Sequence, residues 1–266
     1  IQHGLTESMK DAAQRAVEAG IKVVAFDVNV ENPAIPQVEQ SDYMLGKLAL
    51  EQAIKDNGNS FKAGYVYVPG IAPLDRRDKA WQEVKAANPG IDEVAVFGTL
   101  DNPIANSNAN QARSVLQANS DITVMFAPYD EFAKGVKLAV DEAGLTDQID
   151  IYSADVSTAD ISLMREPGSA WAATVATTKS LSVIVGITFS GNFMYDIFIL
   201  EPISRSSKST TNSFGILSVG QRNSTFRLTI FNTPPLFSPG HLSLLINLTG
   251  ISKLIFEPET IFKKST

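Results

Sequence analysis

The sequence predicts an α/β protein with a parallel, doubly wound sheet. Short apolar strands alternate with helical segments of about ten to fifteen residues, and two strands end in an acidic residue. The chain has 266 residues, of which 44% are hydrophobic, so it can bury one large core or two smaller ones.

The first elements are a helix and a strand. Apolar residues recur on one face of the stretch 6–20, which predicts a helix that ends at Gly20. Ser8 stands three residues before Asp11, as in an N-cap pair. The run 21–27 is apolar and β-branched, which is typical of a strand buried on both faces of a parallel sheet.

The same alternation continues to residue 176. Ser157 is followed three residues later by Asp160, which predicts a capped short helix, and Trp81 lies in mid-helix and is expected in the core. Strands separated by helices imply right-handed crossovers and a parallel sheet. Further helices are predicted at about 43–56, 77–87, 107–117 and 130–144, and strands at 62–68, 93–98, 122–128, 149–155 and 170–176.

The composition changes at Ser180. Up to this residue the chain has 25 acidic and 15 basic residues, a net charge of −10, whereas the remainder has a net charge of +3. All 28 alanines precede Ser180. Because this shift is too abrupt for a loop within one domain, we treat Ser180 as a boundary.

The segment after the boundary has no sustained helical or strand period. Residues 181–200 approach the length of a membrane span, but Asn192 and Asp196 weaken that interpretation. Our hypothesis is that this tail, residues 178–266, is poorly ordered and arose from a frame change or a misjoined gene fragment.

Polar residues follow the predicted strands where ligands of such sheets bind. Asp27 and Asp155 each directly end a strand, so ligand contact is favoured for both; Arg77 and Tyr129 also follow strands. Carboxylates accept hydrogen bonds from hydroxyl pairs, a guanidinium donates two in one plane, and a ring covers a C–H face. The set suits a neutral, polyhydroxylated ligand.

Structural interpretations of some of these polar residues compete with ligand binding. Asp75 and Asp130 stand where helix N-caps belong, which favours capping over ligand contact. Arg76 and Arg77 adjoin Asp75 and Asp78, so a surface ion-pair cluster is as good an interpretation of the composition as a binding site.

Several function classes are disfavoured. The net charge of −7 and the lack of a basic cluster argue against nucleic acid as a partner. The sequence has no cysteine, only two histidines, His3 and His241, and no GxGxxG, Walker or GxSxG motif. We therefore expect no catalysis, no cofactor and no metal site.

Several segments carry a resemblance to a known family: "AGIKVVAFDVN", "QSDYMLGKLALEQ", "GIAPLDRRDKAW", "FAPYDEFAKGVKLAVDEAG" and "ISLMREPGSAWAATVAT". In this order they resemble the type I periplasmic binding proteins of ABC sugar importers, the ribose-binding class in particular, over about residues 1–177. The resemblance implies two Rossmann-like lobes that are joined by a hinge of three crossings and close on a sugar.

The resemblance also implies ligand-binding residues. Tyr129 stands where the family usually has Asn, and Thr177 where it often has Gln. Val28 replaces an arginine, with Asn29 as a substitute donor. The implied set is Asp27, Asn29, Arg77, Tyr129, Asp155 and Thr177.

The family pattern divides the chain into three parts. Residues 1–41 correspond to a remnant of the N-lobe, residues 42–177 to a complete C-lobe, and residues 178–266 to an unrelated tail. Family members have further βα units before the point that matches Ile1, so we expect an N-terminal truncation that impairs binding; no signal peptide is visible in this fragment.

The leading functional hypothesis is a monomeric, solute-binding component of an ABC importer. It would capture a monosaccharide outside the cytoplasm, in the periplasm or anchored as a lipoprotein, and present it to a membrane permease. One alternative is the effector-binding domain of a sugar-responsive transcription repressor, which shares the fold. Another is a doubly wound enzyme of unknown activity.

Overall fold

The computed structural model describes residues 1–2, 4–177, 182–186, 196–200, 213–222, 225–233, 243–245, 253–256 and 260–264. Its helices are α1 (Thr6–Glu18), α2 (Asp42–Asn57), α3 (Ala72–Ala87), α4 (Ile104–Ala118), α5 (Asp130–Ala143) and α6 (Thr158–Met164). Its strands are β1 (Ala25–Phe26), β2 (Gln37–Gln40), β3 (Ser60–Val66), β4 (Gly90–Phe97), β5 (Val124–Ala127), β6 (Asp150–Ala154), β7 (Trp171–Ala176), β8 (Ser182–Gly186), β9 (Asp196–Leu200), β10 (Ser213–Arg222), β11 (Thr225–Thr233), β12 (Ser243–Leu245), β13 (Lys253–Phe256) and β14 (Thr260–Lys263).

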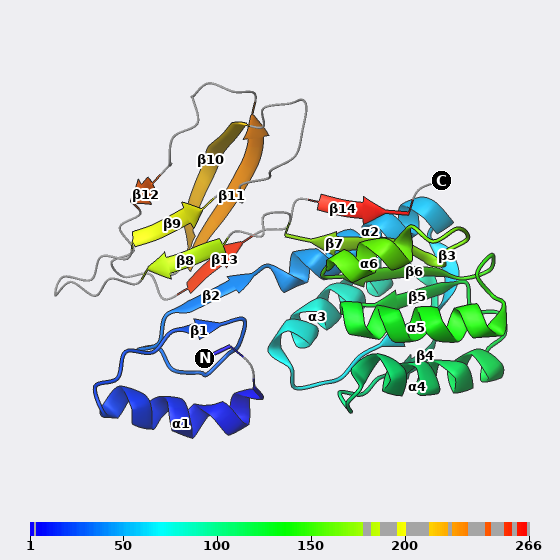
Figure 1. Ribbon diagram of the computed structural model, residues 1–266, viewed down its shortest axis with the longest axis horizontal. Helices are drawn as coiled ribbons and strands as arrows, with labels where there is room; N and C mark the ends of the chain where they lie inside the picture. The colour runs from blue at the N-terminus through cyan, green and yellow to red at the C-terminus, as the bar shows by residue number, and fades with distance from the viewer. Residues whose placement is uncertain are drawn as a thin grey trace.

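A six-stranded sheet carries the larger hydrophobic core. Its strand order is β14-β7-β6-β5-β3-β4, and the strands from β7 to β4 are parallel. Helices α2 and α3 pack on one face, and α4, α5 and α6 pack on the other (Figure 1). The α/β class and the doubly wound sheet predicted from the sequence are therefore confirmed.

Aromatic side chains fill the core between this sheet and α3. Trp81 is fully buried, as the sequence predicted, with its ring centroid 5.1 Å from that of Tyr65 and 5.6 Å from that of Phe126. The rings of Tyr65 and Phe126 are stacked at 5.4 Å. This cluster fixes α3, and with it Arg77, over the carboxyl ends of the strands.

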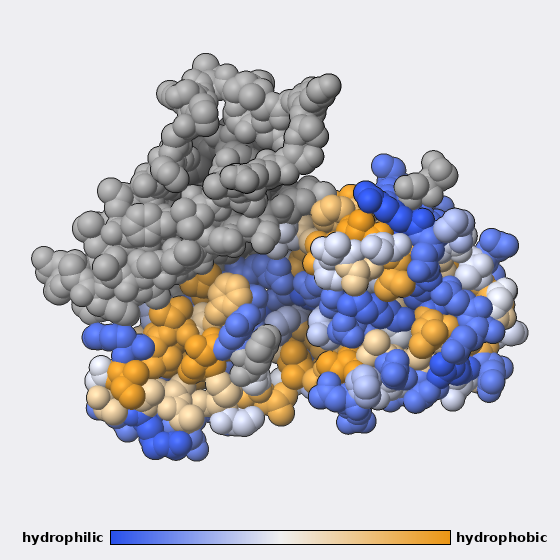
Figure 2. Space-filling model, viewed as in Figure 1, coloured by the Kyte–Doolittle hydropathy of each residue, from blue (hydrophilic) through white to orange (hydrophobic). Residues whose placement is uncertain are grey.

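The N-terminal strand is shorter than the sequence predicts. Only Ala25 and Phe26 of the run 21–27 form β1, and Phe26 is 43% exposed, so burial on both faces was a wrong expectation. Beyond β1 on the side away from β2, the backbone of Ile1 bonds to Val24 and Phe26, and no further strand covers it within the described residues. On the face shown in Figure 2, hydrophobic residues gather over this N-terminal segment.

Strand β2 was not predicted. It consists of Gln37–Gln40, pairs in parallel with β1 and leads directly into α2. Three of its four residues are polar, so it carries no apolar run that would signal a strand. β2 also pairs in parallel with β13, which comes from the tail.

The predicted N-cap residues of α1, α3 and α5 and the predicted start of α3 differ from the structure. Helix α1 begins at Thr6, so Ser8 lies inside it and donates to the Leu5 carbonyl at 3.3 Å instead of capping. Helix α3 begins at Ala72, because a proline in the first turn is compatible with a helix start. The N-cap residues of α3 and α5 are Ile71 and Tyr129, so capping by Asp75 and Asp130 was wrong. The capping box of α6, Ser157 with Asp160, is confirmed.

The described parts of the tail are strands. β10 and β11 pair antiparallel, as do β8 and β9, and β14 pairs antiparallel with β7 at the edge of the six-stranded sheet. No helix in the described ranges is long and apolar enough to cross a membrane. Much of the stretch 181–200 lies outside these ranges. The division of the chain at residues 41 and 177 stays a prediction. The origin and the poor order that we expect for the tail also stay predictions.

Candidate functional site

Two acidic residues mark the site, each directly after a strand. Asp27 follows β1 and Asp155 follows β6, and both have left-handed backbones, with φ of 53° and 73°. Asp tolerates this conformation better than most residues. Each backbone amide still bonds to the neighbouring strand, Asp27 to the Val38 carbonyl at 3.0 Å and Asp155 to the Val175 carbonyl at 2.9 Å. The chain thus turns directly after the last strand hydrogen bond.

Arg77 connects Asp155 to the interior. The residue is 2% exposed, and its guanidinium meets the Asp155 carboxylate with two roughly parallel bonds, Nη1 to Oδ2 at 2.6 Å and Nη2 to Oδ1 at 3.1 Å. Such a forked pair is stronger and more directional than a single hydrogen bond. The surface-cluster interpretation was therefore wrong for Arg77.

Asp42 is a residue of this cluster that the sequence reasoning missed. Its carboxylate is fully buried at the first residue of α2 and accepts from both arginines: Arg77 Nε at 3.1 Å and Nη2 at 2.8 Å, and Arg76 Nε at 3.0 Å and Nη2 at 2.6 Å. Arg76 also lies 3.2 Å from Glu39. In the sequence, Asp42 lies one residue before the helix predicted at about 43–56, in a position typical of a helix start.

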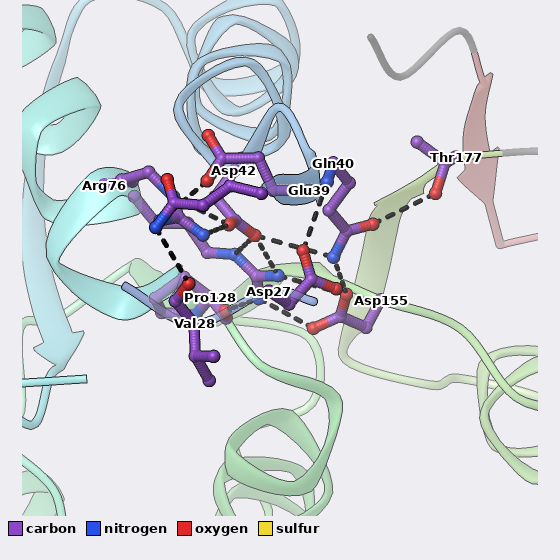
Figure 3. Close-up of polar contacts among 11 residues, drawn as sticks. Asp27, Val28, Glu39, Gln40, Asp42, Arg76, Pro128, Asp155 and Thr177 are labelled. Atoms are coloured by element: carbon purple, nitrogen blue, oxygen red, sulfur yellow. Dashed lines mark hydrogen bonds and ion pairs between the residues drawn. The ribbon is translucent and has the colours of Figure 1, made fainter. Parts of the chain in front are cut away.

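Gln40 joins the two sheets at the site and was also missed. Its side-chain nitrogen, Nε2, lies 3.4 Å from Asp155 Oδ1, and its side-chain oxygen accepts from the Thr177 hydroxyl at 3.0 Å. Its backbone amide donates to Asp27 Oδ1 at 3.1 Å. Three predicted residues are therefore brought together by a fourth that lies at the end of β2 (Figure 3).

Burial raises the pKa of two acidic residues that follow strands, each beside different charged groups. Burial, followed by the charge of Asp42, raises the pKa of Asp27 to about 6, while the Gln40 amide, Arg76 and Arg77 oppose this shift. Burial and then Asp160 likewise raise the pKa of Asp130 to about 6.

Asp27 should make the chain less stable as the pH rises. Its pKa is 3.8 as an ordinary side chain and about 6 in the folded protein, so between these values the unfolded chain loses a proton that the folded chain retains. Asp27→Asn should therefore gain stability relative to the unmodified chain as the pH rises from about 4 to about 7. Urea unfolding of both chains across this range measures the difference.

Comparing the stabilities of these two chains separates the effect of Asp27 titration from that of Asp130 titration. Asp130 is present in both chains, so its own titration largely cancels in their difference. A stability difference between the two chains that does not change with pH would contradict the assigned shift.

Tyr129 lies beside the cluster. It precedes α5, its ring meets Phe132 edge-on at 5.2 Å, and burial raises the pKa of its phenol. The carbonyl of the preceding residue, Pro128, accepts a hydrogen bond from Arg77 Nη1. This contact ties the start of α5 to the guanidinium.

Asn29 is not brought into the cluster. Its side-chain oxygen accepts from the Glu31 amide at 2.9 Å and from Gln37 Nε2 at 3.1 Å, which stabilises the turn between β1 and β2. Asp75 is likewise engaged elsewhere, since it accepts from the Tyr67 hydroxyl at 2.7 Å and the Gly70 amide at 3.0 Å. Across the described residues, no group of three or more His, Cys, Asp or Glu side chains is arranged to hold a metal ion.

Comparisons with known proteins agree with the fold. The family model of the periplasmic binding protein domain matches residues 2–180. The solute-binding protein of a 5-methylthioribose transporter from Thermotoga lettingae, solved with 5-methylthioribose, is 38% identical, with a TM-score of 0.65. A sugar ABC transporter protein from Yersinia enterocolitica is 30% identical, with a TM-score of 0.63. A comparison with curated proteins found no match.

The matches cover only part of the solved structures. The two alignments each cover 66% of this chain, whereas they cover 56% of the Thermotoga protein and 54% of the Yersinia protein. This chain therefore spans about half the length of these relatives. An ABC transporter solute-binding protein from Agrobacterium vitis with bound allitol is 22% identical, with a TM-score of 0.60 over 66% of this chain and 61% of its own, and shares the fold. The chain therefore belongs to the periplasmic binding protein domain family, as its resemblance to the sugar-binding members implied.

Proposed function

We propose that this chain binds a neutral monosaccharide at the Asp27–Arg77–Asp155 cluster, as the substrate-binding component of an ABC importer. The observation that carries this proposal is the meeting of Asp155 with Arg77, and of both Asp27 and Asp155 with Gln40, where strands of two different sheets end. Acceptors and donors that lie close together match the vicinal hydroxyl groups of a sugar.

Each residue has a distinct role in the proposed complex. The Asp27 and Asp155 carboxylates accept from sugar hydroxyls, and the Arg77 edge that faces Asp155 donates to a sugar oxygen. Tyr129 covers an apolar C–H face of the ring. Thr177 holds the Gln40 amide against Asp155. Asn29 stays outside the proposed set because its oxygen is used in the β1–β2 turn.

The relatives support the class of ligand and the biological setting. The Thermotoga protein was solved with 5-methylthioribose and the Agrobacterium protein with allitol, both neutral and polyhydroxylated. The family consists of substrate-binding proteins, and we propose that this chain likewise performs no catalysis. We propose that it acts as a monomer outside the cytoplasm, in the periplasm or anchored as a lipoprotein, and delivers its sugar to a membrane permease.

Titration of the full chain with sugars, followed by backbone amide NMR, tests this proposal. The panel contains ribose, arabinose, xylose, glucose, galactose, allose and 5-methylthioribose. We expect at least one sugar to shift the amides of Asp27, Tyr129 and Asp155 saturably. Because the chain spans about half the length of its relatives, it supplies fewer contacts, and we expect a millimolar rather than a micromolar dissociation constant.

Two variants and one control make the titration decisive. Asp155→Ala should abolish the sugar-induced shifts, whereas Asp101→Asn, in an exposed loop, should leave them unchanged. The proposal fails if no sugar in the panel perturbs these amides, or if Asp155→Ala binds as the unmodified chain does. Micromolar binding would contradict only the expected weakness.

A further inference from the structure

The Arg77 guanidinium has five N–H donors, and each one has a partner. The Nε–H and one Nη2–H donate to Asp42 Oδ1, at 3.1 and 2.8 Å. One Nη1–H donates to the Pro128 carbonyl, and the other Nη1–H and Nη2–H donate to the Asp155 carboxylate at 2.6 and 3.1 Å. A ligand can therefore receive a hydrogen bond from Arg77 only where one of these partners gives way.

The three partners differ in their access to solvent. Asp42 is fully buried and Pro128 is buried, whereas the Asp155 side chain is 28% exposed. Displacing Asp42 would leave a buried carboxylate without one of its two guanidinium partners, which is costly. Asp155 is the partner that water, and hence a solute, can replace.

Asp42 itself is held from two further sides. It lies in the first turn of α2, where the partial positive charge of the helix N-terminus stabilises a carboxylate. Its second oxygen accepts two hydrogen bonds from Arg76. The carboxylate is thus fixed independently of Arg77, and it fixes the guanidinium plane in turn.

We propose that Asp42 is a positioning residue of the binding site, which locks Arg77 so that only its Asp155-facing edge can serve a ligand. This inference rests on the proposed function for its biological meaning, but not for its test. It implies that Asp155 occupies, in the free protein, the place that a ligand oxygen takes on Arg77.

Removing Asp155 should convert that edge into a site for a small carboxylate. In the full chain carrying Asp155→Ala, acetate should take the two free donors, since a carboxylate matches the guanidinium fork. Sodium acetate should therefore raise the thermal unfolding midpoint of this variant relative to sodium chloride of equal ionic strength. The unmodified chain, in which Asp155 fills the edge, should respond equally to both salts.

Asp42→Asn in the Asp155→Ala background tests the positioning role. Loss of the charged partner should weaken acetate binding about tenfold or more, because hydrogen bonds to a charged group are lost and the guanidinium is free to turn. Asp78→Asn in the same background is the matched control. Asp78 follows Arg77 in the chain but accepts from Tyr65 and Gln82, so acetate binding should persist.

The outcomes separate the two parts of the inference. Absence of an acetate effect in Asp155→Ala overturns the assignment of the free edge, and equal acetate binding with and without Asp42→Asn overturns the role of Asp42. If the double variant does not fold, the chemical shift of the Arg77 Nε–H in Asp155→Ala tests the role of Asp42 instead. This shift should not change when acetate is added, and a change as large as that of the Nη protons would overturn the proposal.

The acetate experiment uses no sugar. A negative sugar panel with a positive acetate result would refute the proposed function and leave the role of Asp42 in place. A positive sugar panel without an acetate effect in Asp155→Ala would refute the assignment of the free Arg77 edge and leave the proposed function in place.

Discussion

Arg77→Met is expected to destabilise the chain by about 3–5 kcal/mol, because it removes one guanidinium from a buried carboxylate. Asp42 is fully buried and would retain one of its two guanidinium partners, Arg76, and Asp155 would lose its forked partner. Urea unfolding followed by tryptophan fluorescence measures the change. The chain has two tryptophans, Trp81 and Trp171, and both are fully buried against the six-stranded sheet, so the signal reports this part of the molecule.

Two further variants show whether the loss comes from the buried charge. Arg113→Met removes an arginine whose ion pair with Glu142 is exposed, and it should change the free energy of unfolding by less than about 1 kcal/mol. Adding Asp42→Asn to Arg77→Met should recover part of the loss, because the uncompensated charge is gone. If Arg77→Met costs no more than Arg113→Met, the cluster does not depend on this ion pair.

Phe126→Ala should destabilise the chain by a similar amount, about 3–5 kcal/mol, through a cavity in the core. Phe126 is fully buried in β5, with stacked rings on both Tyr65 and Trp81. Its loss would remove one of the two aromatic rings of the sheet against which Trp81 of α3 packs. The same fluorescence-detected urea titration applies, since neither tryptophan is removed.

Val96→Ala is the matched control for the cavity. Val96 belongs to the same sheet, in β4, but is 52% exposed, so its truncation should change stability by no more than about 0.5 kcal/mol. Comparable losses in the two variants would show that the aromatic cluster does not anchor α3.

Part of the site could be predicted because it depends on where strands end, which the local sequence pattern indicates. Asp155 could be assigned to the carboxyl edge of the parallel sheet, since it ends a strand and the carboxyl ends of parallel strands lie on the same side. Asp27 also ends a strand, but that strand, β1, belongs to a different sheet from β6. The ion pair of Asp155 with Arg77 agrees with that reasoning, although their role in ligand binding stays a prediction.

The partners of these residues could not be predicted in the same way. Asp42 reaches Arg77 across 35 positions and Gln40 reaches Thr177 across 137, and no periodicity links such pairs. The same holds for β2, whose polar residues form a strand only because β1 and β13 lie on either side of it.

The sequence by itself determined the alternation of helices and parallel strands from α2 to β7 and the positions of Asp27 and Asp155 at strand ends, because periodicity and strand ends are local properties. Only the tertiary structure decided that Arg77 is buried, that Asp42 and Pro128 hold three of its donors, and that Asn29 turns away. These outcomes depend on how α2 packs on α3 and how β2 meets β6 and β7. Hydrogen-bond partners of a buried charge are chosen by that packing, not by neighbours in the chain.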